Sequence, residues 1–152
     1  MSREKQIDDA DDAAAERKVR EVHARFYAAM SALDIHEMME VWLCAPTAVC
    51  VHPGREALVG FARILESWQQ IFASAASMSV SAGEELIVIA ADAAWVSCVE
   101  TISITFGEEA ISAAARATNI FRRTPEGRWR LIVHHASPIP ARAAEEWPDV
   151  IN

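Results

Sequence analysis

The hydrophobic periodicity of this chain changes once, near Ala76, and that change constrains the fold more than any other feature. Before it, apolar residues recur at three- and four-residue steps, as they do on one face of an amphipathic helix. After it, apolar and polar residues alternate, as they do in a half-buried strand. Helices followed by strands predict an α+β fold in which the helices pack on one face of a mostly antiparallel sheet.

The first half of the chain carries three stretches with an apolar stripe. Helices are therefore expected at residues 8–33, 35–43 and 56–75. Asp34 precedes the second stretch and can cap its N-terminus with its side chain. Residues 47–52 are rich in small and β-branched side chains and end at Pro53-Gly54, which predicts a short strand that runs into a turn.

The second half is expected to form a meander of long strands. They are predicted at residues 77–90 (as one strand or two), 94–106, 110–123 and 129–138. Three helices cannot cover four long strands completely, so a curved sheet would leave a cone-shaped pocket. We expect one folded domain at 8–140, between a disordered N-terminus (1–7) and a C-terminal tail (141–152).

Composition argues against several classes of partner and cofactor. The chain has 22 acidic and 14 basic side chains, a net charge of −8 that repels phosphate backbones and anionic lipid. We therefore expect neither nucleic acid nor a membrane as partner, and no apolar run is long enough to cross a bilayer. Three cysteines without a C-x-x-C pair favour a reducing, cytoplasmic location. No glycine-rich phosphate loop or metal-ligand spacing is present, so no cofactor and no metal are expected.

Four segments, taken in order, resemble the nuclear transport factor 2-like superfamily in its SnoaL-like or ketosteroid isomerase-like branch. They are ARFYAAMSALDIHEMMEVW, VCVHPG, GFARILESWQQIF and ATNIFRRTPEGRWRLIVHHASP, and they span about residues 15–138. The resemblance implies a cone-shaped α+β domain, three N-terminal helices on a curved sheet, that dimerises through the sheet and holds a pocket beside the helices. This fold hosts isomerases, dehydratases, cyclases and binding modules, so function has to be argued residue by residue.

The resemblance implies candidate catalytic positions. His52 matches the general-base aspartate of the isomerases, and an imidazole can also accept a proton. Phe26 matches a tyrosine of the first helix. Tyr27 lies one step, about 100°, around that helix and is not expected to replace it. Asn119 matches a strand carboxylic acid and can donate a hydrogen bond to an oxyanion. The alternative is that His52 and Asn119 only satisfy hydrogen bonds within the fold.

Two later residues complete the candidate site. Neighbours in a strand face opposite sides, and matching to the family's closing strands implies that His134 faces the pocket while His135 faces outward. Glu100 stands among the apolar positions of its strand, so its pKa is raised or it has a partner. Pairing with Arg116 or Arg130, on adjacent strands, is the slightly favoured alternative.

We therefore predict a protein that binds a small apolar or flat organic ligand, acting as a cofactor-free isomerase, dehydratase or cyclase through His52, Asn119 and His134. The alternative is a non-catalytic dimerisation or ligand-sensing module. Further pocket-lining residues are expected to be Phe26, Tyr27, Trp42, Phe61, Trp68, Glu100 and Phe121. A homodimer packed sheet to sheet is predicted from an outward-facing stripe of Trp129, Leu131, Val133 and His135.

Overall fold

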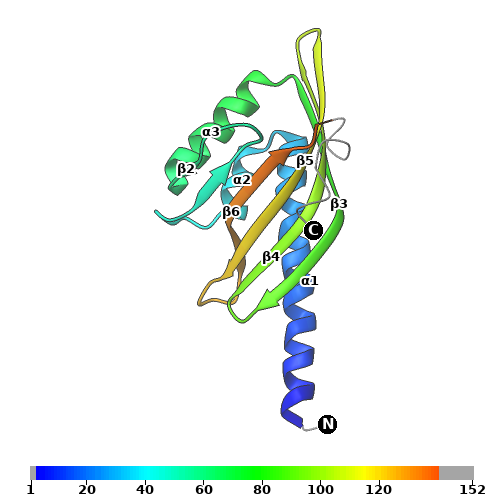
Figure 1. Cartoon of the computed structure of the whole chain (residues 1–152). Coiled ribbons are helices and arrows are strands. Elements are labelled where there is room, and N and C mark those ends of the chain that lie inside the picture. The colour runs from blue at the N-terminus through cyan, green and yellow to red at the C-terminus, as the bar shows by residue number, and fades with distance from the viewer. Residues whose placement is uncertain (1–2, 141–152) are drawn as a thin grey trace, which may run out of the picture.

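The computed structural model describes residues 3–140, and the predicted tail at 141–152 lies outside these residues. Its elements, in chain order, are α1 (Arg3–Ala32), α2 (Ile35–Val41), β1 (Val49–Val51), β2 (Leu58–Val59), α3 (Phe61–Ser74), β3 (Ser77–Ala90), β4 (Ala93–Phe106), β5 (Glu109–Arg123) and β6 (Trp129–Pro138) (Figure 1). The six strands form one sheet in the order β2-β1-β6-β5-β4-β3. Only β1 and β6 pair in parallel, which confirms the predicted α+β fold with a mostly antiparallel sheet.

All three helix predictions need adjusted ends. The first helix begins at Arg3 rather than Asp8, and its N-terminal turns extend beyond the sheet (Figure 1). The second helix ends at Val41, before the predicted 43. Its N-cap is confirmed, because the Asp34 side chain accepts a hydrogen bond from the backbone N–H of Glu37 at 3.0 Å.

The third helix begins later than predicted, at Phe61 instead of residue 56. Leu58 and Val59 instead pair with β1 as a two-residue strand. Gly60 follows with a φ of 98°, a backbone conformation that suits glycine. This residue separates the short strand from the start of the helix.

A β-bulge in β6 overturns part of the predicted outward-facing stripe. A register shift in the β5–β6 pair leaves Ile132 as an extra residue, which reverses the alternation of side chains on either side of it. Trp129 and Leu131 are therefore buried, at 6% and 0% exposure, and the prediction that they face outward is wrong. Val133 is half-buried and His135 is exposed.

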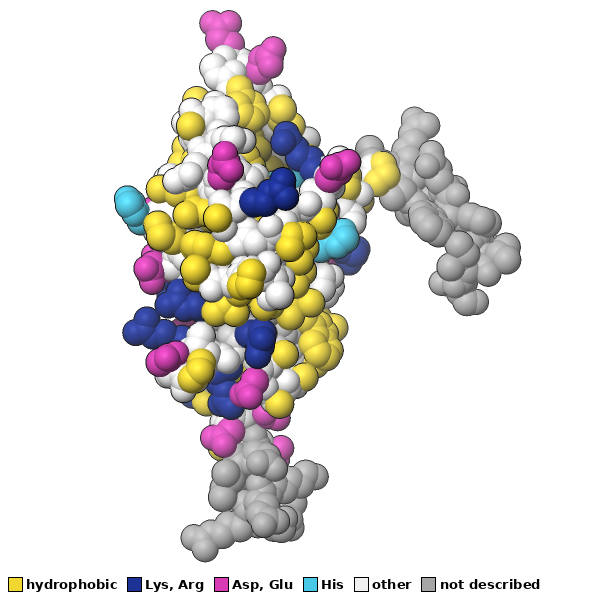
Figure 2. All heavy atoms as spheres, turned by 90° about the vertical axis from the view of Figure 1, so that its left-hand side faces the viewer, with side chains coloured by type: hydrophobic (Ala, Val, Ile, Leu, Met, Phe, Trp, Pro, Cys, Tyr) yellow, Lys and Arg dark blue, Asp and Glu magenta, His cyan; other side chains and the backbone are white. Residues whose placement is uncertain are grey.

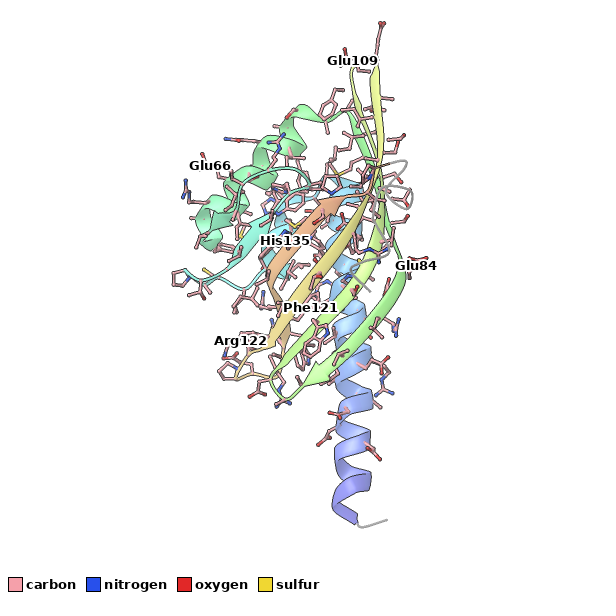
Figure 3. All side chains as sticks on the ribbon, viewed as in Figure 1. Glu66, Glu84, Glu109, Phe121, Arg122 and His135 are labelled. Atoms are coloured by element: carbon pink, nitrogen blue, oxygen red, sulfur yellow. The ribbon has the colours of Figure 1, made fainter. Side chains whose placement is uncertain are left out.

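A second bulge, in β3, moves a different apolar side chain to the outer face. The shift lies between Gly83 and Leu86, and Glu84, labelled in Figure 3, adopts a φ of 51° there. Beyond the bulge, Leu86 is 61% exposed, and Trp95 on neighbouring β4 is 39% exposed. The outer face of the sheet thus carries large apolar side chains at β3 and β4.

The helices and the inner face of the sheet share one hydrophobic core. Every layer contributes a fully buried side chain: Phe26 from α1, Met38 from α2, Ile64 from α3, Val96 from β4 and Phe121 from β5. Burying each such side chain contributes about 1.5–3 kcal/mol to folding. This core fixes α1 and α3 against the sheet at the point where the candidate site lies.

Candidate functional site

A cavity of about 370 Å³ lies between α1, α3 and the inner face of the sheet. Its wall is mostly apolar, with side chains such as Met30, Ile71, Met78, Val80 and Ile102. Trp68 also lines the cavity, together with four residues that have ionisable side chains: His52, Arg55, Glu100 and His134. A few polar groups that converge in an apolar cleft are typical of a small-molecule site.

A tight turn after β1 positions His52 in this wall. Arg55 donates its backbone N–H to the His52 carbonyl at 3.0 Å and closes the turn. Pro53 and Gly54 occupy the central positions, and the Gly54 φ of 73° fits the third residue of a type II turn. The sequence His-Pro-Gly-Arg therefore fixes where the imidazole and the guanidinium leave the backbone.

His52 is held between α3 and the cavity. Its Nε2 atom lies 2.8 Å from the Ser67 hydroxyl, and its ring meets the Trp68 ring edge-on with centroids 4.8 Å apart. Burial, and secondarily the positive charge of Arg55, lowers the pKa of His52 to about 4. The imidazole is therefore neutral at pH 7, so one of its two ring nitrogens carries a lone pair.

Glu100 lines the cavity from β4, and its pKa is raised, whereas that of His52 is lowered. Only 2% of this residue is exposed, and its Oε1 accepts a hydrogen bond from the Tyr27 hydroxyl at 2.8 Å. The same oxygen lies 3.9 Å from Nε2 of His134. Burial raises the pKa of Glu100 to about 7, although the Tyr27 hydrogen bond partly opposes this shift. A carboxyl with that pKa can donate a proton near neutral pH.

The favoured pairing of Glu100 with an arginine is wrong. Strand alternation places Arg116 on the exposed outer face, away from the cavity. Arg130 instead donates to the backbone carbonyl of Glu40 on α2, and lies 3.8 Å from the Glu40 carboxylate. Among residues 9–140 the Glu100 carboxyl thus has no cationic side chain of Arg or Lys in ion-pair contact, which leaves burial to dominate its pKa.

Asn119 lies directly behind the cavity and connects three buried side chains. Its Oδ1 is 2.6 Å from Nδ1 of His134, while its Nδ2 is 2.9 Å from the Tyr27 hydroxyl and 3.0 Å from Nε2 of His23. A carbonyl oxygen only accepts, so Nδ1 of His134 carries the proton. Burial lowers the pKa of His134 to about 3, so the neutral ring has its lone pair on Nε2, toward Glu100.

The structure brings some of the predicted site residues to the cavity and leaves others outside its wall. His52, Trp68, Glu100 and His134 line it. His134 is buried and His135 is exposed, as predicted. Asn119 and Tyr27 form the layer behind the wall, whereas Phe26, Trp42, Phe61 and Phe121 are not among its lining residues.

The expectation that Tyr27 does not take the place of the family's tyrosine stays a prediction. The Tyr27 hydroxyl hydrogen-bonds to the buried acid, Glu100, because α1 is rotated so that Tyr27 faces the sheet. Phe26 instead packs between the other helices and the site, with its ring centroid 5.0 Å from that of His134 and 5.9 Å from that of Trp68.

Sequence reasoning missed His23, Ser67 and Arg55. His23 is 1% exposed and lies behind Asn119, with its Nδ1 atom 3.7 Å from the Glu85 carboxylate. Its spacing of four residues from Tyr27, within the apolar stripe of the first helix, was the available signal. No comparable pattern marks the other two residues, which only the turn and α3 bring beside His52.

The described part of the chain contains neither a metal-binding cluster nor a membrane-spanning helix. Among residues 9–140, no three His, Cys, Asp or Glu side chains are grouped so as to hold a metal ion. None of the helices in that range is long and apolar enough to span a membrane. The expected cytoplasmic location stays a prediction.

Comparison with known families assigns the domain. Residues 19–142 match the SnoaL-like domain, so the chain belongs to the SnoaL-like family of the nuclear transport factor 2-like superfamily. This match covers most of the chain and confirms the resemblance noted in the sequence.

Three relatives illustrate the range of proteins that share the domain. A proposed dehydratase of the NTF2-like family from Streptomyces avermitilis is 29% identical, with a TM-score of 0.78 over 86% of this chain and 99% of the other. A proposed calcium/calmodulin-dependent protein kinase type II association domain from Thiobacillus denitrificans is 32% identical, with a TM-score of 0.63 over 78% and 93% of the two chains. F-box protein SKIP8 from Arabidopsis thaliana is 25% identical over 124 residues, 82% of this chain. The present chain spans about half the length, 51%, of this curated relative.

Proposed function

We propose that this protein is a cofactor-independent acid–base enzyme, of the dehydratase type, that acts on a small organic substrate in the 370 Å³ cavity. One observation carries the proposal: an imidazole with a lowered pKa, His52, and a buried carboxyl with a raised pKa, Glu100, face the same apolar cavity. Their environments move the two pKa values in opposite directions, to about 4 and about 7. Such divergence assigns a base and an acid within one site.

In the proposed reaction, His52 removes a proton from carbon and Glu100 protonates the leaving hydroxyl. The C–H electron pair becomes the new C=C bond, the C–O bond breaks, and water leaves with the proton of Glu100. The Tyr27 hydroxyl, 2.8 Å from Oε1, stabilises the resulting carboxylate. The proton on His52 returns to Glu100 through solvent, so acid and base are restored without a cofactor. Similarity to the proposed dehydratase from Streptomyces avermitilis supports this reaction class.

Asn119 has a positioning role in this scheme. Both of its amide N–H groups are directed at protein acceptors, Tyr27 and His23, so it acts through His134 and Tyr27 rather than by binding the substrate. Asn119 therefore has an indirect role in the proposal, instead of the oxyanion-donor role that the family resemblance implies. His134 is the residue next to Glu100 inside the cavity, with Nε2 3.9 Å from Oε1.

The test is turnover of a panel of small aromatic β-hydroxy ketones, followed by the absorbance of the conjugated product. We expect the unmodified protein to dehydrate at least one member, and Glu100→Gln to lose at least a hundredfold in kcat. Glu109→Gln, an exposed position at the start of β5 that does not line the cavity, is the matched control and should keep full activity. Full activity of Glu100→Gln would contradict the proposal.

A second candidate function, assembly, has its own observation. The outer sheet face exposes Leu86 and Trp95, and the chain is 32% identical to the association domain from Thiobacillus denitrificans. A non-catalytic association module that dimerises through this face would use these side chains, while the cavity would serve only to sense a ligand. Normal dimerisation combined with no turnover of any panel member would favour this candidate.

A further inference from the structure

Arg55 and His52 occupy the wall between two neighbouring cavities. Both residues line the 370 Å³ cavity described above and also a second cavity of about 340 Å³ on the α3 side. The second cavity is lined in addition by Ser67, Arg63 and Gln70, among others. The turn at Pro53-Gly54 fixes the backbone from which both side chains project, so the Arg55 side chain starts next to the proposed base.

The charge of Arg55 has no partner within the part of the chain that the structure describes. Among residues 9–140, no carboxylate lies within ion-pair distance of Arg55. Several exposed arginines, such as Arg63, Arg122 and Arg128, also lack such a partner, whereas Arg20, Arg25, Arg123 and Arg130 have one. Arg55 differs from Arg122 and Arg128 in its position, because it lines the apolar cavity beside His52. Acidic and basic side chains are interspersed on the face seen from the α3 side (Figure 2), so local pairing rather than overall charge decides where an anion would bind.

An aromatic side chain completes this wall. Trp68 lines the first cavity and is 3% exposed, and its ring meets that of His52 edge-on with centroids 4.8 Å apart. Its indole nitrogen is fully buried, so Trp68 offers a ligand apolar ring surface beside the base.

We propose that the substrate is a monocarboxylate with an apolar body, whose carboxylate Arg55 binds where the two cavities meet. The inference rests on the proposed function, because it places this substrate in the same cavity. The apolar body fits the wall formed by residues such as Ile71 and Ile102. Glu56 and Glu66 line the second cavity, and Figure 3 shows Glu66 on the side of α3 away from the sheet. Their negative charges disfavour a second anionic group at that end of the ligand.

The test compares two ligands of the same shape that differ in charge, 3-phenylpropionate and 3-phenylpropionamide. Isothermal titration calorimetry at pH 7 should show the carboxylate binding the unmodified protein about tenfold more tightly than the amide, or better. Arg55→Gln should reduce this preference to less than twofold while the melting temperature stays unchanged. Arg128→Gln, an exposed arginine outside both cavities, is the control and should retain the preference.

Three results would overturn the proposal: equal affinity of the two ligands for the unmodified protein, a preference that survives Arg55→Gln, or binding of neither ligand. The first two leave the acid–base function standing, because the cavity would still bind the amide or the acid by other contacts. Failure of the acid–base function has a separate signature, namely full activity of Glu100→Gln.

Discussion

The Nδ1 atom of His134 lies 2.6 Å from Oδ1 of Asn119, in the buried layer directly behind the cavity. This contact fixes the protonated nitrogen of His134 and leaves Nε2 toward Glu100. The amide of Asn119 also contacts His23 and Tyr27, so one side chain on β5 connects two residues of α1 to one of β6.

Removal of this amide should cost stability. Asn119→Ala leaves the His134 N–H, the His23 lone pair and the Tyr27 oxygen without their partner, and we expect the free energy of unfolding to fall by about 1–3 kcal/mol or more. Urea unfolding followed by fluorescence measures the change. Thr118→Ala, the exposed neighbour on the same strand, is the control and should change stability by less than about 0.5 kcal/mol. Equal effects of the two substitutions would show that the network contributes nothing.

The pH profile of kcat/KM follows from the two proposed catalytic groups. His52 is neutral above about pH 4, and Glu100 is protonated below about pH 7. Activity should therefore be constant between about pH 5.5 and 6.5 and fall tenfold for each pH unit well above 7, as Glu100 ionises. Any substrate found in the panel serves for the measurement. Activity that rises above pH 7 would exclude Glu100 as the acid.

Stability should fall in mild acid because of three buried histidines. The pKa values of His23, His52 and His134 are lowered to about 4, 4 and 3, whereas the unfolded chain has values near 6.5. Groups with lowered pKa values stabilise the fold above pH 6.5, and this contribution is lost as the pH falls toward the folded values. Each histidine adds up to about 1.4 kcal/mol per pH unit to the slope. Glu100 has a raised pKa, so it stabilises the fold below about pH 4.5 and loses that contribution as the pH rises to about 7, which partly opposes the histidines.

The variant His23→Gln isolates one of these contributions. A glutamine oxygen can still accept from Asn119, but the side chain does not titrate. Urea unfolding between pH 6.5 and 5 should therefore give a shallower pH dependence for His23→Gln than for the unmodified protein. Parallel curves for the two proteins would contradict the assignment of a lowered pKa to His23.

The outer sheet face should mediate dimerisation. Light scattering coupled to gel filtration is expected to give twice the 16.7 kDa mass of the chain. The double substitution of Leu86→Lys and Trp95→Lys should yield single chains, because it places two charges in the proposed interface. Met39→Lys changes an apolar residue of α2 that is 37% exposed, and it should leave the mass unchanged. A single-chain mass for the unmodified protein at micromolar concentration would refute this assembly.

Periodicity in the sequence was sufficient to predict the layers. Alternation predicted that His134 and His135 face opposite sides, and the resemblance to the family's closing strands was needed to place His134 inward. The bulge at Ile132 could not be predicted, because one extra residue leaves the composition of a strand unchanged while it reverses the faces of Trp129 and Leu131. The pairing of Leu58 with β1 could not be predicted, because apolar residues directly before a helix fit the helical pattern and were assigned to that helix.

The site was only partly predictable for a similar reason. Spacing within a helix gives the angle between Phe26 and Tyr27, but the packing of α1 on the sheet sets which of them faces Glu100. The contact between His52 and Ser67 joins a turn to α3 and depends on how the two elements dock, information that no local pattern contains.

The most direct test of the acid–base account is the ionisation of Glu100 itself. Carbon-13 NMR of protein labelled at the glutamate carboxyl groups can follow this residue through pH 4–9, and the spectrum of Glu100→Gln identifies its signal. The account predicts a titration midpoint near pH 7, so that the carboxyl is largely protonated at pH 6. A midpoint near the ordinary value of 4.5 would mean that Glu100 is a carboxylate at neutral pH and would contradict its role as the acid.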